Sequence, residues 1–381
     1  MKGRNRLRIS ANAFICTALI SLSLMCTFSS DVGSLPQGSP LGKTRGLADT
    51  VGYAHTPVQI EAVMRMSDSL NSTYVTETLR GYGLDREIRW IAGICPHDDY
   101  IYAGTVYYDI MRNVTARHVI LFGVAHRARD YGLQDRLIFD SFERWRGPYG
   151  PVSVSPLREA ILERLPASDY TVDDAIQSVE HSVEGLIPFL QYSNRDVQIV
   201  SILVPYMNWA TIDRLSRNLA EALESIISEN DLALGRDIAF LCSNDCVHYG
   251  DQGWGGKDYA PFGADVDGYE QAVRRDDSLI EQYLVGQLET EKLHTFFSHL
   301  VDEEDVMTYK ITWCGRFSVP FGLTCVTYLV EALRRPPLRG YLLKYDTSVA
   351  SGELPLRAVG LGTTAPSNLR HWVGYCAIGY R

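Results

Sequence analysis

The sequence lacks the short motifs that mark several large protein classes. It contains no P-loop for phosphate binding and no Gly-x-Ser-x-Gly nucleophile elbow. Its eight cysteines show no repeated pair spacing of the zinc-ribbon kind, and no internal repeat or low-complexity tract stands out. The sequence therefore gives no support for a P-loop nucleotidase, an α/β-hydrolase, a zinc ribbon or a repeat protein.

An excess of basic residues is also missing. The chain has 36 Lys and Arg against 46 Asp and Glu, which gives a formal net charge of −10. A nucleic-acid-binding surface needs a basic face, so this charge argues against nucleic acid as a partner. We expect a small molecule or a peptide as the ligand, and the sequence identifies no protein partner.

The N-terminus has the pattern of a targeting segment. Basic residues between positions 2 and 8 precede a mostly apolar run from Ala13 to Phe28, which is too short for a comfortable membrane span. We therefore expect residues 1–30 to be a signal peptide or N-terminal membrane anchor, followed by a linker rich in Gly, Pro and Ser at residues 31–44. This predicts an exported or membrane-anchored protein, and a cytoplasmic one if the leader is not real.

Two short apolar runs, each followed by a histidine, are the most informative part of the chain. Residues 88–94 lead to His97, and residues 119–122 lead to His126. Between them, residues 103–114 carry apolar side chains at helical spacing. Strand, helix and strand in so few residues predict a βαβ unit with parallel strands. Both histidines would then lie beyond the carboxyl ends of strands, where open α/β sheets place their sites.

Helical and strand patterns alternate through the rest of the chain. Strand-like apolar runs recur at residues 197–204, 238–242, 341–345 and 372–378, with amphipathic stretches between most of them. No strong linker interrupts this alternation. We therefore expect one α/β domain over residues 45–381, with a largely parallel central sheet flanked by helices.

His97 and His126 are the strongest candidate pair for a metal site. Imidazole is the commonest biological metal ligand, and two rings at adjacent strand ends can converge on one ion. A lone histidine at a strand end is more often structural, but two in one βαβ unit favour a site. Asp98 and Asp99 follow His97, and we expect them to cap the next helix, with orientation of the His97 ring as the alternative.

Asp245 and His248 follow the apolar run at residues 238–242. If they lie on a helical turn, their spacing puts both side chains on one face, which suits a general base with an orienting carboxylate, or additional metal ligands. A capped turn with a hydrogen-bonded histidine is the alternative. Cys242 and Cys246 beside His248 also resemble a zinc fragment, but no partner pair with zinc-site spacing is visible.

His181 and Cys314 complete the candidates. His181 lies between Glu180 and Glu184 on a helix expected near residues 173–192, and a solvated surface histidine is the alternative interpretation. Cys314 precedes an apolar helix expected near residues 319–333. A thiolate at a helix start can be a metal ligand or a nucleophile, although a buried inert cysteine is the commoner case.

Five polar motifs occur in a distinctive order. They are Pro96-His97-Asp98-Asp99-Tyr100, Gly123-Val124-Ala125-His126, Glu180-His181-Ser182-Val183-Glu184, Ser243-Asn244-Asp245-Cys246-Val247-His248-Tyr249-Gly250 and Cys314-Gly315. Together they resemble the motifs of the Memo family, also called AmmeMemoRadiSam system protein B, from about Arg45 to the C-terminus. The third motif matches the family pattern Glu-His-Ser-x-Glu, whereas the first departs from Pro-His-Ala-Gly-Tyr at Asp98 and Asp99.

The resemblance implies a fold similar to that of class III extradiol dioxygenases and a metal-binding set of His97, His126 and Cys314. It places Asp245 and His248 beside this set and His181 in the same pocket, which makes these three the candidate catalytic residues. In the dioxygenases a carboxylate completes the two-histidine set, where this chain has Cys314. A thiolate shifts metal preference toward copper or zinc, with iron still an option, so ring cleavage is not supported.

We first expect a Memo-like protein with a mononuclear His/His/Cys site that binds a redox metal, iron or copper. If it is an enzyme, it would be a metal-dependent oxidoreductase related to the extradiol dioxygenases, with His248 or His181 moving protons. A non-catalytic protein that binds a peptide or ligand in the same pocket is the second hypothesis. A metal-dependent hydrolase is the third. Metal content and oxygen consumption separate the first hypothesis from the others.

Overall fold

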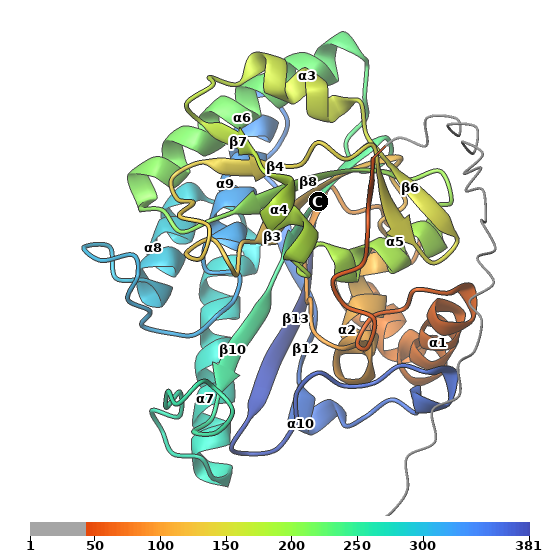
Figure 1. Cartoon of the computed structure of the whole chain (residues 1–381), viewed down its shortest axis with the longest axis vertical. Coiled ribbons are helices and arrows are strands. Elements are labelled where there is room, and N and C mark those ends of the chain that lie inside the picture. Colours follow the sequence, from red (N-terminus) through yellow and green to blue (C-terminus); the bar gives the residue numbers. More distant parts are fainter. Residues whose placement is uncertain (1–42) are drawn as a thin grey trace, which may run out of the picture. The chain divides into compact units, whose positions relative to one another are not determined.

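A mixed sheet of thirteen strands runs through residues 43–381, the part of the chain that the computed structural model describes (Figure 1). Residues 43–381 lie within one compact unit. The predicted signal peptide or anchor and nearly all of the predicted linker lie outside the described residues. None of the helices within residues 43–381 is both long and apolar enough to span a bilayer.

Five parallel strands form the centre of the sheet. In spatial order they are β6 (Gly150–Val154), β8 (Gln198–Val204), β3 (His118–Val124), β9 (Ile238–Ser243) and β2 (Ala92–Cys95). Beyond β2 the sheet continues through antiparallel β13 (Trp372–Tyr380), β12 (Arg339–Thr347) and β11 (Gly286–Gln287). The remaining strands are β1 (Thr44–Arg45), β4 (Leu137–Phe139), β5 (Arg144–Gly147), β7 (Tyr170–Val172) and β10 (Asp245–Tyr249). The predicted α/β domain with a largely parallel central sheet is confirmed.

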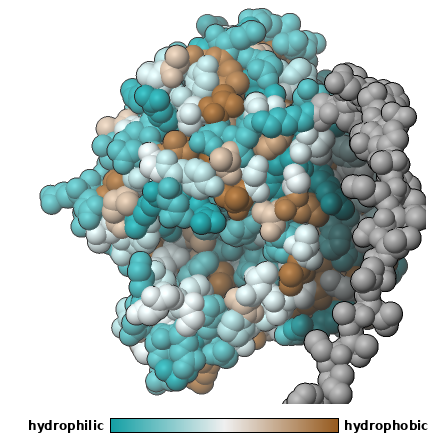
Figure 2. Space-filling model, viewed as in Figure 1, coloured by the Kyte–Doolittle hydropathy of each residue, from teal (hydrophilic) through white to brown (hydrophobic). Residues whose placement is uncertain are grey.

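Helices cover both faces of the sheet (Figure 1). One face carries α1 (Pro57–Gly81), α2 (Tyr100–Met111) and α5 (Ile187–Ser193). The other carries α3 (Leu157–Arg164), α6 (Trp209–Glu229), α7 (Val266–Leu279), α8 (Thr290–Leu300) and α9 (Ser318–Ala332). Strand β3 contributes side chains to the hydrophobic cores on both faces, because its successive side chains point in opposite directions. Ile120 and Phe122 pack on the α9 side of the sheet, and Val119 and Leu121 pack on the α2 side. On the face drawn in Figure 2, hydrophobic residues form small separate patches among hydrophilic ones.

The predicted βαβ unit is present as β2, α2 and β3. Its two strands are parallel, but they are not neighbours, because β9 lies between them and pairs with both. The expectation that His97 and His126 follow adjacent strands is therefore wrong. Strands that are close in sequence need not be neighbours in the sheet. The placement of β9 brings the segment that begins at Asn244 to the same edge of the sheet, between the ends of β2 and β3.

Arg45 in β1 is a buried cation that holds the segment carrying Glu180 and Glu184. Its guanidinium pairs with the Glu184 carboxylate and donates to the backbone carbonyls of Gln177, at 3.1 Å, and Glu180, at 2.5 Å. Both members of the ion pair are at most 3% exposed, and the ring of Trp145 packs 4.4 Å from the guanidinium. A buried charge without its partner is strongly destabilising, so this pair fixes where residues 180–184 lie.

Replacing Arg45 tests this role. Arg45→Met keeps a long side chain but leaves the Glu184 carboxylate buried and unpaired, so the free energy of unfolding should fall by about 3–5 kcal/mol in a denaturant titration at pH 7. The matched control is Arg357→Met, whose partner Glu353 is exposed and whose loss should cost less than about 1 kcal/mol. Similar losses in the two variants would contradict the assignment.

Candidate metal centre

The histidines gather in a cavity of about 240 Å³ at the carboxyl edge of the parallel strands. His97 follows β2, His126 follows β3, and Asp245 and His248 lie on β10 directly after β9. Cys314 does not line this cavity, but its sulfur contacts His126 and His248, which do. The structure thus brings all six predicted site residues together, because His181 lines the cavity as well. Their roles stay predictions.

His97 has one ring nitrogen held and the other free. Its Nδ1 lies 2.8 Å from the Ser243 hydroxyl, which itself donates to the Ser182 carbonyl at 2.6 Å. Because the Ser243 hydroxyl donates its only hydrogen to Ser182, it must accept a hydrogen bond from His97 Nδ1. In the His97 ring, Nδ1 therefore carries the proton and Nε2 carries a lone pair. Burial lowers the pKa of His97 to about 4. Nε2 is buried and has no hydrogen-bond partner.

His126 is oriented by a buried carboxylate. Glu180 accepts from the His126 backbone N–H at 2.8 Å and from its Nδ1 at 2.9 Å, which turns Nε2 toward Cys314. Burial opposes both charges, but mutual attraction outweighs it. The pKa of His126 is raised well above its ordinary value, and that of Glu180 is lowered well below its own. The His126 side chain is 27% exposed, so solvent reaches this side of the cavity.

The sequence predicts a helix at His181, and this prediction is wrong. Helix α4 (Asp174–Val179) ends before Glu180, and a single 3₁₀ turn (Glu184–Leu186) precedes α5. The break is explained by Glu180, whose side chain accepts from the Ser182 N–H at 2.9 Å and thereby replaces helical hydrogen bonding. In this conformation the His181 ring stacks on that of His126, with ring centroids 4.7 Å apart and planes within 13°.

The surroundings of Cys314 favour its thiolate form. Its sulfur lies 3.1 Å from His248 Nε2 and 3.4 Å from His126 Nε2. Burial alone would raise the pKa of the thiol, yet His248 and His126 hold it well below its ordinary value. The Cys314 backbone N–H donates to the Asp245 carbonyl at 3.0 Å, which ties the cysteine to β10. A low-pKa thiol among imidazoles is both a good metal ligand and a reactive nucleophile.

Asp245 and His248 lie on a strand, and the prediction of a helical turn is wrong. They pair with β13, and an irregularity between them lets both side chains face the cavity despite their odd spacing. The Asp245 carboxylate accepts from the His97 backbone N–H at 2.9 Å, and its other oxygen lies 3.4 Å from His97 Nε2. Burial and the charge of Asp98 raise the pKa of Asp245 well above its ordinary value.

The donor set fits a metal ion. One ligand atom each from His97, His126 and His181 lies within 4.8 Å of the other two. The orphaned, buried Nε2 of His97 needs an electron-pair acceptor, and both His97 and His126 have their Nδ1 atoms held by oxygen atoms, as metal-binding histidines usually do. Cys314 offers a thiolate next to His126 but is not part of this three-histidine group.

Asp98 and Asp99 do not cap α2, which corrects the sequence-based expectation. Asp99 occupies the N-cap position, but its side chain makes no capping bond. Both of its oxygens instead accept from Thr364, whose backbone N–H lies 2.5 Å away. Asp98 accepts from the Tyr375 hydroxyl. These distant partners explain the error, because nothing local in the sequence indicates that residues 364 and 375 reach this site.

Sequence reasoning also missed part of the cavity wall. Asp49, Tyr53, Trp254, Thr364 and His371 line it. They come from segments outside the named helices and strands, with His371 directly before β13, and none stands in a recognisable motif. The only available signal was Trp254, an aromatic residue in the glycine-rich loop that follows β10.

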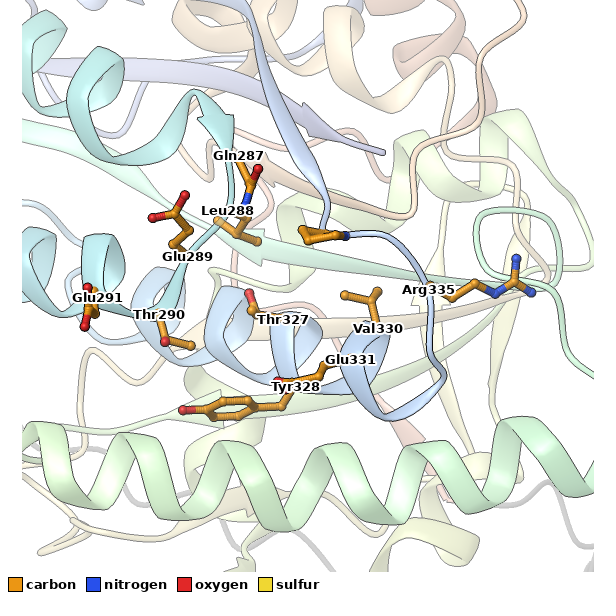
Figure 3. A pocket seen from close by; sticks show the side chains of 11 residues that line it. Gln287, Leu288, Glu289, Thr290, Glu291, Thr327, Tyr328, Val330, Glu331 and Arg335 are labelled. Atoms are coloured by element: carbon orange, nitrogen blue, oxygen red, sulfur yellow. The ribbon is translucent and has the colours of Figure 1, made fainter.

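A larger cavity of about 530 Å³ lies elsewhere, between the start of α8 and the second half of α9 (Figure 3). Its wall is built from polar and aliphatic side chains, including Glu289, Glu291, Glu331 and Arg335. It contains neither histidine nor cysteine and shares no residue with the histidine cavity. Size alone therefore does not locate the chemistry of this protein.

The reactivity of Cys314 can be measured in metal-free protein. Because its pKa is lowered, the thiolate should persist as pH falls, so alkylation by iodoacetamide at pH 7 should be on the order of tenfold faster than for an ordinary thiol. His248→Gln removes one stabilising imidazole, which should raise the pKa and move the fall in rate to higher pH. Labelling should vanish in Cys314→Ser. A Cys314 rate that falls only near pH 8–9 in the unsubstituted protein would refute the thiolate assignment.

Comparison with known proteins agrees with this architecture. The Memo-like protein family matches residues 64–364. A MEMO1 family protein of Pyrococcus furiosus is 31% identical over 270 residues, which cover 68% of this chain and 80% of that protein. A MEMO1 family protein of Saccharolobus islandicus is 26% identical over 261 residues, or 67% and 75% of the two chains. One of Methanosarcina barkeri is 30% identical over 166 residues, or 43% and 57%. The chain belongs to the Memo family.

Proposed function

We propose that this protein binds one redox-active metal ion, iron or copper, through His97, His126 and Cys314. The observation that carries the proposal is the buried, unpartnered Nε2 of His97, which lies in the same cavity as His126 and His181. Two imidazoles and a thiolate form a soft, mixed donor set, which suits copper or iron better than magnesium or calcium. His181, 41% exposed at its side chain, then lies beside the ion or replaces Cys314 as the third ligand.

The bound metal would supply a Lewis acid that can also change its oxidation state. The chain's own residues provide orientation and proton transfer. Glu180 and the Ser243 hydroxyl fix the two imidazole rings. His248 is hydrogen-bonded to Cys314 and lines the cavity, so it can hold or deliver a proton where a ligand enters. Asp245, with its raised pKa, is a second proton carrier on the same wall.

Metal content is the first test. Purified protein should contain close to one iron or copper per chain by elemental mass spectrometry, and His97→Ala should remove at least about nine tenths of it, because the variant loses a buried ligand. Glu229→Gln is a matched control on the surface, since its carboxylate only meets the exposed Arg164. Stoichiometric zinc in place of iron or copper would contradict the redox proposal. No metal after anaerobic reloading would refute the site.

The third ligand is decided by spectroscopy. Cobalt(II) or copper(II) bound to wild-type protein should give a thiolate charge-transfer band if Cys314 is a ligand. The band should disappear in Cys314→Ser and persist in His181→Ala. The opposite pattern, no such band in the wild type and loss of metal in His181→Ala, would assign a three-histidine site and exclude Cys314.

A further inference from the structure

The wall of the histidine cavity is strongly acidic. Asp49, Asp98, Asp99 and Asp245 line it, and none of its lining residues is a lysine or an arginine. Within residues 43–381, Asp245 has a histidine neighbour, since its carboxylate lies 3.4 Å from His97 Nε2, and no ion pair is formed by the other three. The acidic groups of this wall are therefore four carboxylates, and its basic groups are histidines.

Neutral groups hold these carboxylates in place. Asp98 accepts from the Tyr375 hydroxyl and the Asp99 backbone N–H, and Asp99 accepts from Thr364. Asp49 accepts from the backbone N–H of Val51 and that of Gly52. Such hydrogen bonds orient a carboxylate without cancelling its charge. The negative potential is thus built into a fixed wall.

A metal ion in this cavity would be held by histidines of its wall, His97 and His126. The four aspartates that line the same cavity are not among the proposed ligands. Their carboxylates favour a positively charged ligand group over an anionic one at this wall.

A pair of stacked aromatic rings lines the same cavity. The ring of Trp254 stacks on that of His371, with centroids 3.9 Å apart and planes within 8°, and both line the cavity. The His371 Nδ1 lies 2.8 Å from the Gln252 carbonyl, to which it must donate, and this bond holds the ring in place. An indole ring in the same wall as several carboxylates suits an organic cation, whose carbon skeleton packs on the ring while its charge meets a carboxylate.

The cavity is also built to hold something. The unpartnered Nε2 of His97, a residue only 1% exposed, is a sign separate from the acidic residues that a bound group belongs in this cavity. The proposed function gives this atom to the metal, and the second ligand would lie beside it. The volume of about 240 Å³ is below the ~300–1,000 Å³ common for drug-sized ligands, which favours a small molecule over a peptide.

We propose that this cavity binds a small organic amine in its ammonium form, with the amino group between Asp98 and Asp99 and the carbon skeleton against Trp254. The proposal deepens the proposed function by naming the ligand class for the same site, and it rests on that function only for the metal's position.

The test compares three probes of similar shape: 2-phenylethylammonium, neutral 2-phenylethanol and anionic 3-phenylpropanoate. Isothermal titration calorimetry on the wild type should show the ammonium probe binding at least about tenfold more tightly than the alcohol, with the carboxylate weakest. Asp98→Asn should weaken the ammonium probe about tenfold and leave the alcohol unchanged. Glu270→Gln, which removes an exposed charge from α7, should change neither.

A further variant and a separate measurement of metal content complete the test. Trp254→Leu should weaken 2-phenylethylammonium several-fold but spare n-butylammonium, which has no ring to stack on the indole. Equal or tighter binding of 3-phenylpropanoate, or no binding of either ammonium probe, would overturn the inference. The comparison of these probes on the wild-type protein tests the inference even if Asp98→Asn fails to fold. Amine selectivity in a protein that binds no metal would refute only the proposed function, and metal binding without amine selectivity would refute only the inference.

Discussion

The buried carboxylate of Glu180 is the constraint on which the site depends. It accepts from the backbone and ring of His126 and from the backbone of Ser182, so one charged group joins the end of β3 to the segment after α4. A buried carboxylate cannot do without such partners, because an unpaired charge in the interior is destabilising by several kcal/mol. Arg45 fixes the same segment through its hydrogen bond to the Glu180 carbonyl and its ion pair with Glu184. The orientation of His126 is thus a consequence of folding itself.

The order of the strands decides which residues meet. Because β9 is inserted between β2 and β3, Ser243 at its end can bind the His97 ring, and Asp245 can bind the His97 backbone. Without that insertion, His97 would lack the group that fixes its tautomer. The parallel centre of the sheet therefore contributes more than a scaffold, since it sets the protonation pattern of a candidate ligand.

Local patterns in the sequence were enough to predict the βαβ unit, the α/β class and the polar residues that follow β2, β3 and β9. They were not enough to predict conformations decided by distant partners. The break before His181 depends on Glu180 bonding to Ser182, and the irregularity in β10 depends on its pairing with β13. The strand order and the residues of the C-terminal wall depend on contacts across more than a hundred positions, for which periodicity carries no signal.

Charge changes sign across the His126–Cys314 pair. On one side lies the acidic cavity, and on the other a smaller one of about 70 Å³ that includes Arg129 and Arg316 with both His126 and Cys314 in its wall. The lowered pKa of Cys314 comes from the imidazoles of His248 and His126, which contact its sulfur. His126 belongs to the walls of both cavities, whereas Cys314 lines the smaller cavity and His97 the larger one. The thiol and the buried imidazole of His97 therefore belong to cavities of opposite charge, and His126 is the residue that joins the two.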